Sequence, residues 1–451
     1  MTFQYMPCRN RFAISIIFTL CLLNLLLTAW WWSFSTWQSP TIRNVTTCKP
    51  DWKFPVFSNK TNTYEVSLVV QVADNGHGNG RSANRWVYGH QIQQGHSFQR
   101  IYTFADLAKI PDDRWKRPIP RSVFLLYPQA LDMKQVVADI MNCRPVPEAP
   151  IFKQVIRFLQ VSSSVCVPDK AAERSLDAIV MIKSAIYNFA DRERLRRTYD
   201  EEAQRKSSIR MALVFSVGLP RSSGGRFFQR DGFQISLPHR AGKSLHEMQS
   251  KRTEVLRKLD KETRRNGDLV LGDYEDTYFN LSLKLFHTFQ WACRFCRAHF
   301  THQQRPPVFV LMDDDYAFNA SLLKAELAAL SDEQIRRVTL GIPDNTERVV
   351  RFRYAAWYEK WALSKREVPW PIHAPFAAST FLVFGADVLQ EIALAMYFTQ
   401  QFPVDDAWLG LVMTRLNLSF QSTASMYKDL PKAKETVLFA PYEYIFGSQK
   451  L

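Results

Sequence analysis

Three adjacent carboxylates, Asp313-Asp314-Asp315, directly follow the apolar run Val308–Met312. Like charges so close together repel one another and raise each other's pKa, so the cluster is costly unless a cation offsets it. Mg²⁺ and Mn²⁺ prefer oxygen ligands and commonly use one or two carboxylates together with the phosphates of a nucleotide. A solvated acidic turn is the alternative interpretation. The position at the end of a buried strand, where open α/β sheets bind their ligands, favours a metal site.

A second acidic pair, Asp405-Asp406, precedes the apolar stretch Ala407-Trp408-Leu409. Acidic residues in the first turn of a helix interact favourably with its dipole, which is the ordinary structural explanation. The functional interpretation is that one of the two acts as a general base in a partly apolar site that tunes its pKa. The pair alone does not decide between these two explanations.

A third segment, Gly272–Lys284, leads from a short strand into a helix, with Asp276 or Thr277 as the N-cap. Lys284 then lies two turns into the helix. It is either a phosphate ligand or a surface lysine, and its spacing from the cap does not choose between them.

The elements that must position these groups alternate along the chain from about Leu176. Short apolar runs predict strands buried on both faces, at Ala178–Ile182, Met211–Val217, Leu269–Leu271, Val308–Met312 and Thr380–Phe384. Helical patterns lie between them, at Asp191–Lys206, Ser244–Asp260, Leu281–Phe300 and Ala320–Leu330. Alternating strands and helices predict an α/β domain with a mostly parallel sheet.

The N-terminal part carries a membrane signal. Residues 12–32 contain no charge and are long enough to cross a bilayer as one helix, which ends in tryptophans. Arg9 and Arg11 precede the segment, so the positive-inside rule places the N-terminus in the cytosol. A cleaved signal peptide would have a shorter apolar core that ends in small residues. The chain is therefore predicted to have four parts: a cytosolic tail (1–11), a transmembrane signal anchor (12–32), a lumenal stem with partial structure (33–175) and a folded α/β domain (176–451).

Charge and composition agree with a lumenal location. The formal net charge of +15 suits an anionic partner, but a lumenal protein does not meet a genome, so nucleic acid is excluded as a partner. Of five lumenal sequons, those at Asn44 and Asn59 are predicted to be glycosylated. Five lumenal cysteines lie in an oxidising compartment, and their pairing cannot be read from the sequence.

Taken together, these segments resemble one known family, the β-1,3-galactosyltransferases (glycosyltransferase family 31), and especially its brainiac-type branch. The resemblance covers about Leu176 to Phe420. It rests on motifs in the same order and spacing, found here at Ile182–Tyr199, Glu262–Lys284, Asp313–Asn319, Lys360–Pro369 and Asp405–Gly410.

The resemblance implies a GT-A type nucleotide-sugar-binding domain in 176–451 and a type II protein of the Golgi membrane, anchored in the lipid bilayer by residues 12–32. It implies an inverting enzyme that moves galactose or an N-acetylhexosamine from a UDP-sugar to a glycan acceptor on glycoprotein or glycolipid, with Mn²⁺ or Mg²⁺ as cofactor. A homo- or hetero-oligomer in the Golgi is compatible with it.

Residue roles also follow from the resemblance. It implies that Asp313 and Asp315 hold the metal and that Asp406 removes the proton of the acceptor hydroxyl. Asp405 and Trp361 are expected at the acceptor. The residues expected near the donor are Ser184, Arg192, Arg196, Asp276, Lys284 and Asp314.

Several positions depart from the family pattern. Leu311 stands where a lysine is usual, Ala377–Thr380 replaces a glycine-rich turn, and no histidine follows His373 to complete a metal site. These departures leave open a catalytically inactive relative that acts as a Golgi chaperone or scaffold. A metal-dependent phosphohydrolase could also use the three carboxylates, but the other motifs do not support it.

Overall fold

The computed structural model describes residues 55–73, 104–167, 176–204, 209–300, 303–352 and 359–447. These residues fall within one compact unit, Pro50–Leu451. The predicted cytosolic tail and the predicted anchor at 12–32 lie outside the described residues. Within the described part of the chain, no helix is both long and apolar enough to cross a membrane.

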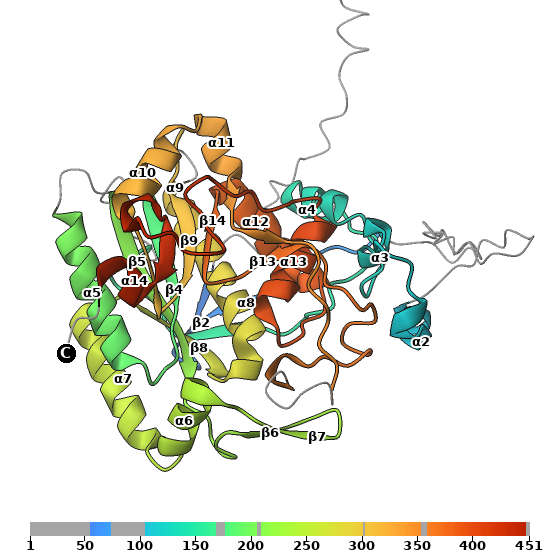
Figure 1. Cartoon of the computed structure of the whole chain (residues 1–451), viewed down its shortest axis with the longest axis horizontal. Helices are drawn as coiled ribbons and strands as arrows, with labels where there is room; N and C mark the ends of the chain where they lie inside the picture. Colours follow the sequence, from blue (N-terminus) through green and yellow to red (C-terminus); the bar gives the residue numbers. More distant parts are fainter. Residues whose placement is uncertain are drawn as a thin grey trace, which may run out of the picture. The chain divides into compact units, whose positions relative to one another are not determined.

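A central sheet organises the described residues (Figure 1). Its nine strands run in the spatial order β1-β2-β3-β8-β5-β4-β9-β14-β11. Their bounds are β1 Val56–Ser58, β2 Thr63–Val66, β3 Ile156–Gln160, β4 Ala178–Lys183, β5 Met211–Leu219, β8 Leu269–Glu275, β9 Val308–Asp313, β11 Thr339–Leu340 and β14 Phe381–Phe384.

The four strands in the centre of the sheet, β8, β5, β4 and β9, are parallel. The strands on both flanks pair antiparallel. The α/β class and all five predicted strands are confirmed, whereas the flanks make the whole sheet mixed. All six residues of β4 are buried, as expected for a strand covered on both faces.

Helices cover both faces of the sheet (Figure 1). Their bounds are α2 Phe104–Lys109, α3 Arg121–Phe124, α4 Met133–Met141, α5 Phe189–Ala203, α6 His239–Glu247, α7 Arg252–Asn266, α8 Leu281–Trp291, α9 Arg297–Phe300, α10 Ala320–Ala328, α11 Asp332–Arg337, α12 Ala386–Ala395, α13 Asp405–Arg415 and α14 Tyr442–Phe446. Short turns of helix are η2 Asp112–Arg114, η3 Tyr278–Asn280, η4 Ala292–Cys296, η5 Glu359–Trp361, η6 Met396–Phe398 and η7 Lys434–Thr436.

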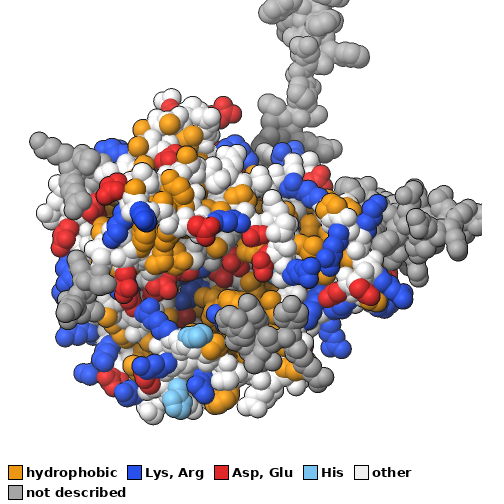
Figure 2. Space-filling model, in the orientation of Figure 1, with side chains coloured by type: hydrophobic (Ala, Val, Ile, Leu, Met, Phe, Trp, Pro, Cys, Tyr) orange, Lys and Arg blue, Asp and Glu red, His pale blue; other side chains and the backbone are white. Residues whose placement is uncertain are grey.

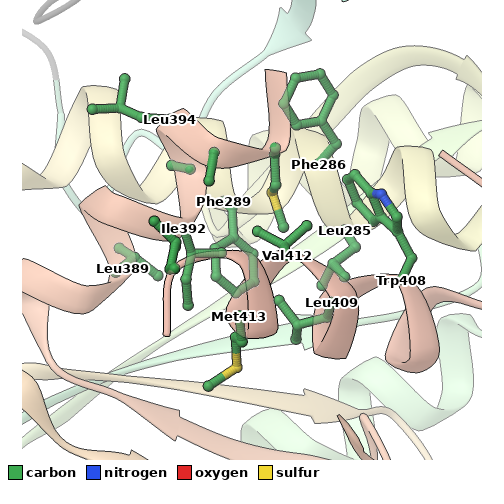
Figure 3. Close-up of a cluster of buried hydrophobic side chains, with 14 of the residues drawn as sticks. Leu285, Phe286, Phe289, Leu389, Ile392, Leu394, Trp408, Leu409, Val412 and Met413 are labelled. Atoms are coloured by element: carbon green, nitrogen blue, oxygen red, sulfur yellow. The ribbon is translucent and has the colours of Figure 1, made fainter. Parts of the chain in front are cut away.

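Two hydrophobic cores lie on opposite faces of the sheet, because alternate strand residues point to opposite sides. In β4, Ile179 and Met181 belong to the core with α8, α12 and α13, while Val180 and Ile182 belong to the core with α5, α7 and α10. Figure 3 shows the first core, where apolar side chains of α8, α12 and α13 interdigitate. This packing fixes the start of α13, which carries Asp405 and Asp406.

Two predicted helices have internal breaks. The prediction at Ser244–Asp260 corresponds to parts of two helices, α6 and α7. The prediction at Leu281–Phe300 corresponds to α8 and α9 with a π-helical turn, η4, between them. Such π turns inside helices often occur near functional sites.

The segment predicted as a stem contributes ordered elements to this unit. Strands β1, β2 and β3 extend the sheet beyond β8. Side chains of α3 and α4 join the same core as α12 and α13. A disulfide from Cys166 to Cys296 ties this segment to the turn after α8. The segment is therefore part of the framework behind the candidate site.

In the described segments, three two-stranded ribbons stand outside the central sheet. Strands β12 (Pro343–Asp344) and β13 (Phe376–Ala377) form one of them, and Gly410 of α13 packs directly against it. A Cβ at Gly410 would lie 2.4 Å from the Cβ of Phe376. Only glycine therefore allows α13 to come this close. The other ribbons pair β10 (Tyr316–Phe318) with β15 (Phe439–Pro441), and β6 (Phe227–Arg230) with β7 (Phe233–Ser236).

Candidate active site

A buried lysine joins the two acidic motifs at the carboxyl edge of the parallel strands. Lys183 ends β4 and lies beside Asp313, which ends β9. Its Nζ atom is 3.1 Å from Oδ1 of Asp313 and 2.7 Å from Oδ2 of Asp405. It also donates a 2.6 Å hydrogen bond to Oγ of Ser379, which donates in turn to Asp405. One ammonium group thus connects β4, β9, the turn before β14 and the start of α13.

The charges in this cluster influence each other's ionisation. Burial lowers the pKa of Lys183, but the carboxylates of Asp313 and Asp405 outweigh burial and hold the pKa above its usual value. Burial raises the pKa of Asp313 to about 6, helped by the charges of Asp405 and Asp315 and opposed by Lys183. The side chain of Asp313 is 32% exposed, so it is open to a ligand on one side.

Asp406 lies next to this cluster and faces a cavity. The cavity has a volume of about 230 Å³ and is lined by Trp361, His373, Phe376 and Asp406, among others. Burial and the neighbouring charge of Asp405 raise the pKa of Asp406 to about 7. A carboxylate with this pKa can accept a proton efficiently near neutral pH. We name this space the inner cavity.

Asp405, in contrast, is not among the residues that line the inner cavity. Its carboxylate is buried and engages Lys183 and Ser379. Although the sequence placed Asp405 at the acceptor, its contacts are those of a group that positions Lys183. The two acids at the start of α13 therefore have different surroundings.

Aromatic side chains form the wall of the inner cavity. Trp361, predicted at the acceptor, lines it together with Phe376. The ammonium of Lys360 lies 4.0 Å from the ring centroid of Trp361 and 5.6 Å from that of Tyr278. Burial and the charges of Asp405 and Asp406 raise the pKa of Tyr278, so this phenol stays protonated at neutral pH.

The middle acid of the three, Asp314, turns inward. Its Oδ2 atom accepts hydrogen bonds from Ser184 Oγ at 2.6 Å and Asn188 Nδ2 at 2.8 Å. Both partners belong to the loop between β4 and α5. Asp314 and Ser184, which were predicted near the donor, thus hold this loop against β9.

Asp276 and Lys284 form a buried ion pair behind the same loop. The Nζ atom of Lys284 is 2.8 Å from Oδ1 of Asp276 and donates to the carbonyl oxygen of Ser184 at 2.6 Å. Oδ2 of Asp276 accepts the backbone N–H groups of Ile186 and Gly218. Lys284 is therefore neither a surface lysine nor exposed to the inner cavity.

Arg192 and Arg196 share Glu262, a residue for which the sequence predicted no role at the site. Arg192 is fully buried and pairs with both carboxylate oxygens of Glu262 at 2.9 and 2.7 Å. It also donates to Ser184 Oγ and to the carbonyl oxygen of Ala185. Arg196 pairs with Glu262 at 2.8 Å and with Asp268 at 2.7 Å. These contacts join α5 and α7 and hold the loop after β4.

Replacing Glu262 with Gln should destabilise the protein by roughly 3–5 kcal/mol at pH 7, because the buried charge of Arg192 loses its partner. Burial raises the pKa of Glu262, but the hydrogen bonds and charges of Arg192 and Arg196 outweigh burial and lower it. The contribution is thus present above the unfolded pKa of about 4.3 and is lost on acidification through the lower folded pKa. Thermal unfolding of the full-length protein at pH 7 and pH 4 measures the difference.

The control is Glu254→Gln, which removes an exposed partner of Lys258 on the same helix. An exposed pair contributes little, so this variant should unfold like the wild type. Equal effects of the two substitutions would contradict a buried network around Arg192.

Two further predicted residues concern glycosylation. Asn59 lies exposed in the turn between β1 and β2, while Asn44 is outside the described residues. Glycosylation at both stays a prediction.

Lys183, Ser379 and Glu262 are the residues that the sequence reasoning missed. Lys183 had a signal, because it ends a strand of six buried residues, where a charged side chain needs partners. Glu262 and Ser379 come from other segments, and only the fold brings them to their partners.

The fold and the site together define an α/β domain that binds its ligand at the carboxyl ends of parallel strands, the usual place in open α/β sheets. On the face drawn in Figure 2, acidic side chains gather around a hollow in the middle of the molecule. Asp313 and Asp315 are open to a ligand, the buried Lys183 lies beside Asp313, and Asp406 can accept a proton at the inner cavity. This arrangement is suited to transferring a group between two ligands.

Comparison with known proteins shows which family this part of the chain is similar to. Residues 247–424 match the family model described as galactosyltransferase. The chain is 29% identical over 170 residues to beta-1,3-galactosyltransferase 5 of Homo sapiens, covering 38% of this chain and 50% of that protein.

More distant relatives extend the match. The chain is 25% identical over 255 residues to UDP-GlcNAc:betaGal beta-1,3-N-acetylglucosaminyltransferase 9 of Bos taurus, covering 56% of each protein. It is 25% identical over 261 residues to beta-1,3-galactosyltransferase brn of Drosophila melanogaster, covering 56% of this chain and 66% of that protein. These matches confirm the resemblance to the β-1,3-galactosyltransferase family and its brainiac-type branch. The chain spans about half the length of the first of these relatives.

Proposed function

We propose that the protein is an inverting β-1,3-glycosyltransferase with a GT-A type domain. It moves galactose or an N-acetylhexosamine from a UDP-sugar to a hydroxyl of a glycan on glycoprotein or glycolipid. The observation that carries the proposal is Asp406, a carboxylate with a pKa of about 7 that lines a cavity next to the acidic cluster around Lys183. The family match supports the same reaction.

In the proposed reaction the acceptor sugar occupies the inner cavity. Its hydroxyl oxygen attacks the anomeric carbon of the donor while Asp406 takes the hydroxyl proton. The bond from the anomeric carbon to the diphosphate oxygen breaks, and UDP leaves with the bonding electron pair. Attack opposite to the leaving group inverts the anomeric configuration. Trp361 and Phe376 offer apolar ring faces that orient the acceptor.

The acids after β9 fit a divalent cation. Asp313 is partly exposed and Asp315 is exposed, so their oxygen atoms are open to a metal, whereas Asp314 points inward. No group of three or more suitable ligand side chains occurs in the part of the chain that the structure describes. Mn²⁺ or Mg²⁺ commonly uses one or two carboxylates plus substrate phosphates, which matches this donor set. When bound, such a cation would neutralise negative charge on the diphosphate.

Replacing Asp315 with Asn should weaken Mn²⁺-dependent binding of UDP by about tenfold or more, because one of two protein ligands loses its charge. The measurement is a UDP titration of the full-length protein at several Mn²⁺ concentrations. Asp273→Asn, which changes an exposed acid on β8, is the control. Unchanged Mn²⁺ dependence in the Asp315 variant would rule it out as a ligand.

The pH dependence of transfer should follow the ionisation of Asp406. Only the ionised carboxylate can accept the proton, and its pKa is raised to about 7. We therefore expect kcat/KM to rise with pH through about 7 and to fall about tenfold per pH unit well below it. A pH profile of initial rates measures this limb. If kcat/KM instead fell only near the ordinary aspartate pKa of about 4, Asp406 would not be the base.

The proposal includes the location of the enzyme. Residues 12–32 would anchor it in the Golgi membrane as a single-pass type II protein, with the galactosyltransferase-family domain in the lumen. The uncharged apolar segment and the sequons support this proposal.

A donor panel tests the proposed function. Full-length protein in detergent is incubated with Mn²⁺ and UDP-galactose, UDP-N-acetylglucosamine or UDP-N-acetylgalactosamine, with and without glycan acceptors. We expect UDP release that depends on the acceptor and on one donor. Folded protein that binds UDP but releases none from any donor with any acceptor would support the inactive scaffold instead.

A further inference from the structure

In the motif Lys360–Pro369, which the structure describes in full, only Trp361 lines the inner cavity. The motif also contains Ser364 and Glu367, which the proposed reaction does not use. Apart from the short turn η5, this fully described stretch forms no helix or strand. The position of Trp361 therefore depends on contacts between its loop and other parts of the chain. We name residues 359–370 the wall loop.

Glu367 joins two parts of the wall loop and connects the loop to β6. Its Oε2 atom accepts hydrogen bonds from the backbone N–H of Ser364 at 2.8 Å and from Ser364 Oγ at 3.1 Å. Its Oε1 atom accepts a 2.6 Å hydrogen bond from Nη2 of Arg230. Nη1 of Arg230 donates to the carbonyl oxygen of Ala362, the residue after Trp361, at 2.9 Å. One guanidinium group thus binds the loop at two points, and the bond to the carboxylate is charge-assisted.

The hairpin of β6 and β7 gives Arg230 a fixed base. The ring of Phe233 on β7 stacks on Phe352, with centroids 4.7 Å apart and planes 8° apart. The guanidinium of Arg230 lies 4.9 Å from the ring centroid of Phe279 in η3. The side chains of Arg230 and Glu367 are 12% and 26% exposed, so their ion pair is mostly shielded from water. Such a pair constrains the loop more than an exposed pair would.

A second set of contacts reaches the wall loop from the segment before β3. The carboxylate of Asp112 lies 3.0 Å from Nε of Arg351 and 3.0 Å from Nζ of Lys365. The hydroxyl of Tyr127 donates to the carbonyl oxygen of Glu367. Arg351 donates to three carbonyl oxygens of the loop, those of Leu363, Val368 and Trp370. These contacts hold the main chain of the loop, so the loss of one side-chain pair should not unfold it.

The partners of Glu367 keep it apart from the residues expected at the donor. Among the described residues, none of these partners belongs to the cluster around Lys183 or to the contacts that hold the loop after β4. Asp406 lies on α13, which is fixed by the core that it shares with α8 and α12. A change at Glu367 should therefore affect the reaction through the wall of the inner cavity.

We propose that Glu367 is a positioning residue of the acceptor site, which together with Arg230 holds Trp361 in the wall of the inner cavity. The inference rests on the proposed function, because that function places the acceptor in this cavity. Glu367 touches neither substrate and acts through Trp361. Binding of the acceptor therefore depends on the pair of Arg230 and Glu367, whereas donor binding and proton transfer to Asp406 do not.

Replacing Glu367 with Gln removes the charge that pairs with Arg230. With full-length protein, Mn²⁺, and the donor and acceptor that the donor panel identifies, we expect the KM for the acceptor to rise about tenfold. The KM for the donor and kcat should stay within about twofold of the wild type, as expected when only acceptor binding is lost. Glu391→Gln is the matched control. Glu391 forms a similar pair with Arg337 at 2.8 Å on α12, outside the inner cavity, so all three constants should stay unchanged.

A double variant shows whether Glu367 acts through Trp361. Trp361→Ala alone should raise the KM for the acceptor. Adding Glu367→Gln to it should cause no further rise, because the ring to be positioned is absent. Additive effects, an unchanged acceptor KM in Glu367→Gln, or an equal rise of the donor KM would each overturn the proposal and leave the transferase standing.

A milder variant covers the case in which Glu367→Gln does not fold. Arg230→Lys keeps the charge but offers one donor group in place of a planar fork, so the KM for the acceptor should rise several-fold and that for the donor should not. An acceptor KM equal to that of the wild type would then overturn the proposal. Wild-type protein that binds UDP but transfers to no acceptor would contradict the proposed function, and this inference with it.

Discussion

Replacing Asp406 with Asn should lower kcat for sugar transfer by roughly 10²- to 10⁴-fold, the usual contribution of a positioned general base. Asparagine keeps the shape of the side chain but cannot take up the hydroxyl proton. Asp406 lines the inner cavity and lies outside the network of Ser184, Arg192 and Lys284, so UDP binding should change little. Initial rates and UDP titrations of the same preparation measure the two effects separately.

Asp332→Asn is a matched control for this variant. Asp332 also lies in the first turn of a helix, α11, but it has no part in the proposed reaction and pairs with Arg305 at the surface. If the only role of Asp406 were a favourable interaction with the dipole of helix α13, the two substitutions would have similar small effects on stability and no effect on the rate of sugar transfer. Loss of transfer and UDP binding together in Asp406→Asn would contradict its role as a base.

Replacing Lys183 with Met should destabilise the protein by roughly 3–5 kcal/mol at pH 7 and abolish transfer, because Asp313 and Asp405 lose their shared cation. The pKa of Lys183 is raised, so its contribution is present throughout the range below about 10. The pKa of Asp313 is raised to about 6, so in the variant this one unpaired carboxylate is neutralised as pH falls towards 5, and the deficit should be smaller there. Thermal unfolding at pH 7.5 and pH 5 measures both effects.

Two comparisons make this prediction specific. Lys258→Met removes an exposed lysine with an ion pair of 2.8 Å and should change stability little. Adding Asp405→Asn to Lys183→Met should recover part of the lost stability, because it removes one of the unpaired charges. A double variant as unstable as the sum of the two single variants would contradict direct coupling between Lys183 and Asp405.

The sequence was sufficient for the central strands and the two acidic motifs. Continuous apolar runs such as Val308–Met312 are a strong signal, because a strand buried on both faces must be apolar along its whole length. It was not sufficient for the antiparallel flanks. Strand β3 and the short β1 and β2 lie in a segment rich in proline and glycine, where local patterns are weak.

The candidate site, like the fold, could be predicted from the sequence only in part. The position at the end of a buried strand singled out Asp313 and Asp315, and the resemblance to a known family singled out Asp406; the roles of all three stay predictions. The sequence could not show that Asp314, Asp276 and Arg192 face inward, because the contacts to Ser184, Ile186 and Glu262 join segments far apart in the chain. These three residues position the loop after β4, and their roles depend on the fold.

The most direct test of the central claim is the structure of the product. The full-length enzyme is supplied with a UDP-α-sugar and a glycan acceptor, both identified by the donor panel, and the product is analysed by NMR. A new sugar in β-configuration at the 3-hydroxyl is the result we predict, since the hydroxyl deprotonated by Asp406 attacks opposite to UDP. An α-linked product would contradict direct displacement with Asp406 as the base.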